Sequence, residues 1–267
     1  MRTTILRSCA AIALIAAAAS MSAQSVVLSV EEYQEMKRTR TLPPAYNVRY
    51  STLPAAGVHP PKGVAHSGGQ PKKGGGSNGF CNCWLEPDND YTLAMTPNDD
   101  GSSALITLPF DFNLYGQLYN NCYINNNGNV SFGSPYGTYS ADPFPTSGFT
   151  MVAPFWADVD TRGSDCTGSL GDGGQVLYKI TPTAMYVNWV EVGYYGCFVD
   201  KKNTFQLIIT DGTDPVIGVG NNVSFCYKDM QWTTGNASQG VNGFGGIPST
   251  VGANEGNGTD FIQFTRN

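Results

Sequence analysis

Residues 125–160 read NNNGNVSFGSPYGTYSADPFPTSGFTMVAPFWADVD. The stretch combines turn-forming Asn and Gly, a short strand-like run at 129–133, a Pro/Gly loop, a second strand-like run at 150–156 and an acidic end. The second run contains MVAPFW, which is apolar throughout instead of alternating, and this is typical of a strand buried on both faces. The stretch therefore predicts the central strands of a β-sheet.

Further strand-like runs, each bounded by turn residues, lie on both sides of this stretch. Alternating apolar and polar residues are clearest in the runs at 204–210 and 222–230, and the Thr-Pro-Thr connection at 181–183 is short enough for a hairpin. The sequence predicts an all-β fold, an antiparallel β-sandwich-like domain with disulfides. Its predicted strands are 104–110, 122–125, 129–133, 150–156, 175–180, 184–193, 204–210, 222–230 and 260–264, the last being an edge strand or the point where a longer chain is cut.

The chain divides into three parts. Residues 1–23 have a basic start, an apolar run and a small-residue end, which predict a secretory signal peptide and a secreted, extracellular protein without a membrane span in the mature chain. Residues 24–80 predict a short helix, capped by Ser29 and Glu32, followed by a Pro/Gly-rich basic linker that is largely disordered. Residues 81–267 form the β domain.

Charge is distributed unevenly between these parts. Residues 24–80 carry a net charge of +4, and the chain from residue 81 carries −12. The acidic domain would repel phosphate, which argues against nucleic acid as a partner. The basic KRTR segment that ends the predicted helix is interpreted as solvated, with contact to an acidic surface as the alternative. Both histidines, His59 and His66, precede the domain, which excludes catalysis by an imidazole of its own.

Removal of the signal peptide leaves six cysteines in an oxidising compartment, where disulfides are expected. Cys166 and Cys197 bracket the open ends of the predicted hairpin and are expected to pair with each other. The other four are expected to form disulfides in an order that the sequence does not assign: Cys81, Cys83, Cys122 and Cys226. Metal binding by the cysteines is a weaker alternative, because no CxxC spacing occurs.

Two sets of side chains are candidates for a binding site. Asp158 and Asp160 alternate along a strand, so their carboxylates lie on one face and could bind calcium as a cofactor. The preferred interpretation is structural: these carboxylates cap backbone N–H groups or pair with Arg162. The second set consists of aromatic residues that could contact a protein or a sugar ring: Tyr136, Tyr139, Tyr194 and Tyr195.

Several motifs in order, namely NNGNVSFG, VAPFWADVD, NTFQLII and DMQWTTG, resemble the nidogen-like extracellular (NIDO) domain over about residues 84–264. The resemblance implies a non-enzymatic extracellular module for cell–matrix or cell-surface adhesion, and it brings over no catalytic residue. Together with the leader, it suggests a bacterial secreted protein whose partner is an extracellular protein or a surface glycan. The alternative function is a glycan-binding or glycan-hydrolysing protein that uses the acidic and aromatic loops.

Overall fold

The computed structural model describes residues 30–39, 41 and 84–264. The predicted signal peptide and most of the predicted linker lie outside these residues, as do Cys81 and Cys83. One α-helix, α1 (Val30–Arg38), precedes the β domain. The strands of the domain are β1 (Thr92–Leu93), β2 (Ile106–Leu114), β3 (Gln117–Asn125), β4 (Asn129–Phe132), β5 (Thr150–Trp156), β6 (Val159–Asp160), β7 (Gln175–Ile180), β8 (Ala184–Tyr194), β9 (Phe198–Thr210), β10 (Val223–Met230), β11 (Thr250–Asn254) and β12 (Phe261–Gln263), with a 3-10 helix η1 (Asn236–Ser238) before β11.

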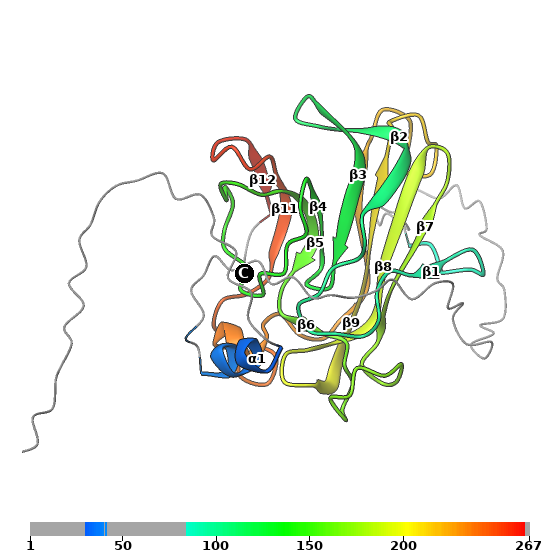
Figure 1. Cartoon of the computed structure of the whole chain (residues 1–267). Helices are drawn as coiled ribbons and strands as arrows, with labels where there is room; N and C mark the ends of the chain where they lie inside the picture. Colours follow the sequence, from blue (N-terminus) through cyan, green and yellow to red (C-terminus); the bar gives the residue numbers. More distant parts are fainter. Residues whose placement is uncertain (1–29, 40, 42–83, 265–267) are drawn as a thin grey trace, which may run out of the picture.

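The strands form two antiparallel six-stranded sheets, which confirms the predicted sandwich. One sheet has the order β1-β7-β8-β9-β10, with β6 also paired to β8, and the other has the order β12-β11-β5-β4-β3-β2. The predicted hairpin is present as β7 and β8, paired from Gln175 with Val190 to Ile180 with Met185. The sheets face each other across the main core, while α1 lies beyond one end of them, near β6 (Figure 1).

Strand β2 shows how the sequence pattern positions the core. Its residues alternate between buried and exposed along the whole strand, so Ile106, Leu108 and Phe112 face the other sheet. Pro109 lies in the middle of β2 and cannot donate a ladder hydrogen bond, which is tolerated because β2 is the edge strand of its sheet. The β2–β3 register shifts between Thr107 and Phe112, at the proline. The strand runs to Leu114, four residues beyond the predicted end at residue 110.

Strand β5 is buried on both faces, as its continuous apolar run predicts. Val152 and Phe155 face the main core between the sheets, whereas Met151 and Trp156 face a second apolar cluster. The loop between β4 and β5 covers that second cluster with Tyr136, Ala141 and Phe144. The Pro/Gly loop of the opening stretch is therefore a structural cover over the sheet.

The cysteines divide into bonded and free groups. Cys166 and Cys197 form a disulfide, as predicted, and Cys226 is also disulfide-bonded. The expectation of a disulfide at Cys122 is wrong, because Cys122 is a free thiol. Its side chain is fully buried in the main core, where Sγ contacts Sδ of Met185 at 3.9 Å. Cys122 points between the sheets, and it acts there as a small apolar core residue.

None of the helices in the described ranges is long and apolar enough to cross a membrane.

Candidate functional site

The most unusual side chain of the described residues is Lys37, which is completely buried although it comes from α1, outside the sandwich. Its Nζ donates hydrogen bonds to Asp100 Oδ2 at 2.7 Å, Asp158 Oδ1 at 2.7 Å and Asp99 Oδ2 at 3.0 Å. All three carboxylates are at most 2% exposed. One ammonium group is therefore enclosed by three buried carboxylates, an arrangement that we call the lysine site.

The carboxylates of the lysine site come from two loops. Asp99 and Asp100 precede β2, and Asp158 lies between β5 and β6. The fully buried side chain of Asn127 joins the loops, because its Nδ2 donates to Asp100 Oδ1 at 2.6 Å and its Oδ1 accepts from the backbone N–H of Val159 at 3.0 Å. The amide therefore orients the carboxylate of Asp100 and ties its loop to the loop that carries Asp158.

Asn126 ties the same loops together a second time. Its Nδ2 donates to the backbone carbonyls of Asp99 and Val159, and its Oδ1 accepts from Thr161 Oγ1. The NNNG turn between β3 and β4 is thus the scaffold of the site. The sequence pattern identified it as a turn, but it gave no sign of this second role.

Two tyrosine rings complete the enclosure around the ammonium. Lys37 Nζ lies 4.5 Å from the ring centroid of Tyr139 and 4.2 Å from that of Tyr195, within the range of cation–π attraction. The predicted group of four contact tyrosines is therefore split. Tyr136 and Tyr194 are each 2% exposed, and their rings pack against Trp156 and Trp232 respectively, so these two belong to the core.

Burial and charge act in opposite directions on the titratable groups of the site. Burial alone would lower the pKa of Lys37, but Asp100, Asp158 and Asp99 together hold that pKa well above its ordinary value. Burial raises the pKa of Asp158 well above its usual range, and Lys37 offsets only part of that rise. Burial and the neighbouring Asp100 likewise raise the pKa of Asp99. The lysine in this site is therefore protonated, whereas burial disfavours the charged forms of Asp158 and Asp99.

Two carboxylate oxygens of the site have no hydrogen-bond partner among the described residues. They are Asp99 Oδ1 and Asp158 Oδ2, and both are inaccessible to solvent. Buried carboxyl oxygens are costly to leave without a donor or a cation. Lys37 therefore satisfies the site only in part.

Asp160 has a different role from Asp158. Its Oδ1 accepts from Arg162 Nε at 2.9 Å, and its Oδ2 accepts from Arg162 Nη2 at 2.6 Å and from the backbone N–H of Cys197 at 3.0 Å. This confirms the structural interpretation for Asp160, which pairs with Arg162 and fixes the β8–β9 turn to the loop after β6. Asp158 instead contacts the lysine of α1.

The acids with the geometry of a cation site are Asp99, Asp100 and Asp158, each of which offers an oxygen within 4.8 Å of the others. Of these, the sequence pattern pointed to Asp158 alone. The NDDG turn at 98–101 was the available signal for the other two, and KRTR was the signal for the lysine. The two basic residues that end α1 differ, because Arg38 is exposed whereas Lys37 is buried in the acidic site. The solvated interpretation was thus wrong for Lys37, and the alternative of an acidic surface is confirmed.

Comparison with known families identifies the domain that carries these acids. The family model described as NIDO related matches residues 85–266. The chain belongs to the NIDO-related family. The match contains all twelve strands and the three acids of the lysine site, while α1 lies before it. The carboxylates are therefore part of the NIDO-related domain, and the lysine reaches them from outside.

Curated relatives agree with this assignment. Human Alpha-tectorin is 33% identical over 195 residues, which cover 62% of this chain and 8% of the relative. Chicken Alpha-tectorin is 34% identical over 186 residues, with the same coverage of 62% and 8%. Nidogen of Drosophila melanogaster is 26% identical over 165 residues, or 54% of this chain and 12% of the relative. The chain thus spans a small part of these relatives' length, and no solved structure matches it. A bacterial origin stays a prediction.

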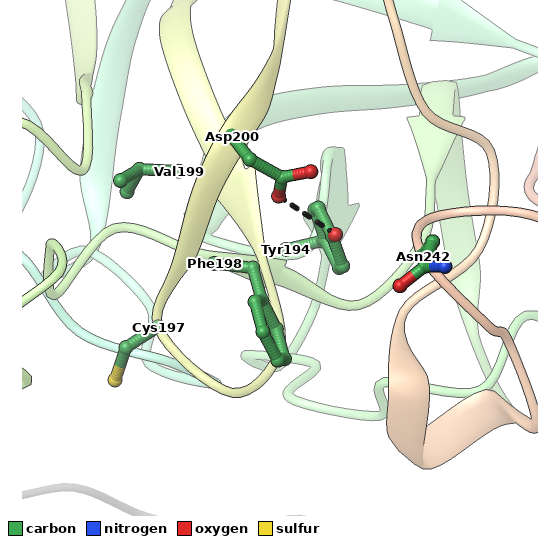
Figure 2. Close-up of a pocket in the computed structure, with 6 residues that line it drawn as sticks. All are labelled: Tyr194, Cys197, Phe198, Val199, Asp200 and Asn242. Carbon is green, nitrogen blue, oxygen red and sulfur yellow. Dashed lines mark hydrogen bonds between the residues drawn. The ribbon is translucent and has the colours of Figure 1, made fainter.

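A shallow depression on the NIDO-related domain has less to offer a ligand than the lysine site. Figure 2 shows the depression beside the β8–β9 turn, lined by Tyr194, Cys197, Phe198, Val199, Asp200 and Asn242. The hydroxyl of Tyr194 already donates to Asp200 Oδ1 at 2.8 Å, and the ring of Phe198 stacks on that of Tyr194. These groups satisfy one another, so the lysine site is the better candidate.

Proposed function

We propose that this chain is a secreted, non-enzymatic interaction module that holds other extracellular proteins by capturing a lysine-bearing segment in the lysine site. Membership of the NIDO-related family and the Cys166–Cys197 disulfide support an extracellular location, because disulfides persist in oxidising compartments. The leader-like residues 1–23 support secretion. A role in adhesion between cells or to matrix follows from the same proposal.

The observation that carries the proposal is the enclosure of Lys37. A helix outside the sandwich inserts one ammonium group between three carboxylates and two tyrosine rings. Gln34 adds one further hydrogen bond, from its Nε2 to Asp99 Oδ2. The next residue, Glu35, is exposed and pairs with Arg38 of its own helix. Among the described side chains of α1, most of the bonds to the acids come from one lysine, which is the pattern of a buried anchor.

The arrangement supports binding better than catalysis. Residues 84–264 contain no histidine, and the acids of the site are occupied by a strongly protonated lysine. A hydrolase would need an acid and a base flanking an open cleft, whereas these carboxylates are buried and bonded. The proposed partner is accordingly a protein segment that presents a lysine, and α1 is the example within this chain.

The proposal can be tested with a fluorescent peptide that spans residues 29–41. The receiver is the full chain carrying Lys37→Ala, so that the competing lysine is removed while the carboxylates stay. We expect saturable binding by fluorescence anisotropy. The Kd of the peptide should rise about tenfold or more when the receiver also carries Asp158→Asn, since charge-assisted hydrogen bonds to buried groups contribute strongly.

A peptide with Ala at position 37 serves as the matched control and should not bind. Equal binding of the two peptides, or unchanged binding after Asp158→Asn, would show that the site does not recognise lysine. Adding Asp90→Asn to the receiver tests for general charge effects, because Asp90 belongs to an exposed pair of acids around Lys179.

A further inference from the structure

The lysine site has the oxygen arrangement of a calcium site. Carboxylate oxygens of Asp99, Asp100 and Asp158 all lie within 4.8 Å of one another. Oxygens within that spacing are close enough to share one cation, and Ca²⁺ binds its oxygen ligands at about 2.3–2.6 Å. Lys37 Nζ already occupies the common centre, at 2.7 to 3.0 Å from one oxygen of each acid.

Two unsatisfied oxygens of the same acids add a second observation that favours a larger cation. Asp99 Oδ1 and Asp158 Oδ2 are the second oxygens of carboxylates whose first oxygens bind Lys37, and neither has a partner in the described parts of the chain. An ammonium group has three donors, and three acceptors already use them. Ca²⁺ takes six to eight oxygens and binds carboxylates through both oxygens, so it can satisfy atoms that a lysine leaves alone.

Charge favours a divalent ion in the same position. The described residues place two cations, Lys37 and Arg162, against four carboxylates that are at most 2% exposed, namely Asp99, Asp100, Asp158 and Asp160. Arg162 donates two hydrogen bonds to the carboxylate of Asp160, and its Nη2 lies 3.6 Å from Oδ2 of Asp99. Replacing a single positive charge by a double one at the centre would compensate the carboxylates more fully.

We propose that Asp99, Asp100 and Asp158 bind a calcium ion in exchange for Lys37, so that calcium and α1 occupy the lysine site alternately. One centre cannot hold both cations, because each needs the same three oxygens. The exchange ends the three bonds of Lys37 to the acids and competes with the bond of Gln34 to Asp99, so it weakens the attachment of α1. The metal site does not depend on the proposed function. Control of segment capture by calcium does depend on the proposed function.

The metal is tested on the full chain after treatment with a chelator, using Tb³⁺ as the probe. Tyr139 and Tyr195 lie close enough to the centre to sensitise Tb³⁺ luminescence, and added Ca²⁺ should displace the signal. The Kd for Ca²⁺ should be lower by about tenfold or more in Lys37→Ala than in the unaltered chain, because the competing ammonium group has been removed. Asp158→Asn should lose the signal, and Asp90→Asn should keep it.

Release of α1 is measured by trypsin cleavage after Lys37 in the unaltered chain. Ca²⁺ should accelerate this cleavage, whereas Mg²⁺ should have a smaller effect because it sheds its water reluctantly. Lys37→Met, which keeps much of the aliphatic side chain, replaces Lys37→Ala if the latter does not fold.

Three results would overturn the inference: no Tb³⁺ luminescence in any variant, equal Ca²⁺ affinity with and without Lys37, or trypsin cleavage that ignores Ca²⁺. The peptide assay separates this failure from failure of the proposed function. Peptide capture without calcium binding removes the metal site alone, whereas calcium binding without peptide capture removes only the control of capture.

Discussion

Lys37 Nζ lies 2.7 Å from Oδ1 of Asp158 although 121 residues separate the two in sequence, and both side chains are completely buried. A contact of this kind joins the helix before the domain to the loop that follows the central strand β5. Removing one partner of a buried ion pair is costly because the other is left without compensation. The stability of the domain and the position of α1 are therefore linked through the lysine site.

Lys37→Ala should lower the free energy of unfolding by up to about 3–5 kcal/mol. Water that reaches the vacated carboxylates will reduce this loss. Lys179→Ala is the matched control, because Lys179 also contacts two acids, Asp88 and Asp90, but these are 55% and 76% exposed. Its cost should stay below about 1 kcal/mol. Urea denaturation of both variants measures the difference, and equal costs would contradict the importance of burial.

Gly128 lies in the turn that carries Asn127. Gly128→Ala should prevent folding or lower the free energy of unfolding by about 4 kcal/mol or more, because the added Cβ would overlap the carbonyl oxygen of Phe155. Gly116→Ala provides the control. Both glycines have positive φ, at 75° and 88°, but a Cβ at Gly116 meets nothing within 4 Å. Its cost should be the backbone strain alone, about 1–2 kcal/mol. Thermal unfolding of the two variants separates steric overlap from strain.

Tyr139→Leu and Tyr195→Leu should each weaken capture of the peptide that spans residues 29–41, because each ring lies over the lysine ammonium. A cation–π contact of about 0.5–2 kcal/mol corresponds to a rise in Kd of about 2- to 30-fold. Phe261→Leu, at a partly exposed aromatic residue on β12, should leave the Kd unchanged. Unaltered affinity in both tyrosine variants would limit recognition to the carboxylates.

Cys122 should resist alkylation in the folded protein and react readily in denaturant. Burial raises the pKa of its thiol from 9.0 to about 12, so the folded state holds the proton more tightly than the unfolded state. The stability that this proton contributes is complete below pH 9 and is lost between pH 9 and about 12, by up to about 1.4 kcal/mol per pH unit.

Mass spectrometry of the Cys122 peptide after labelling tests the first expectation. The stability difference between the unaltered chain and Cys122→Ala, followed from pH 8 upward, tests the second. Rapid labelling at neutral pH, or a difference that does not shrink with pH, would contradict them.

Much of the fold was predictable because it depends on local patterns. The observed bounds of β5 and β7 equal the predicted ones, since apolar runs between turn residues define both strands. Strand β9 begins at Phe198 instead of at the predicted residue 204. Its first six residues, FVDKKN, lack a clear alternating pattern, but Phe198 and Asn203 pair with Tyr194 and Val192 of β8. Strand β11 was missed because TVGAN has weak strand propensity, and pairing with β5 and β12 supplies what the residues lack.

The candidate site was only partly predictable for a related reason. The pair of Asp160 with Arg162 spans two residues, so spacing alone suggested it. The contact of Lys37 with Asp99 spans 62 residues, and no periodicity reports a contact between a helix and a turn so far apart. The buried amide of Asn127 resembles any turn asparagine in sequence, and only its two bonds to the acid loops reveal its role.

The lysine site also has a consequence for how its occupant can vary. Its carboxylates lie within residues 85–266 of the family domain, while its cation lies in a nine-residue helix that precedes them. An insertion, deletion or exchange in that helix would alter what fills the site without touching a single strand. Under the proposed function, changes confined to this short helix would alter the segment that competes for the acids and leave the sandwich itself unchanged.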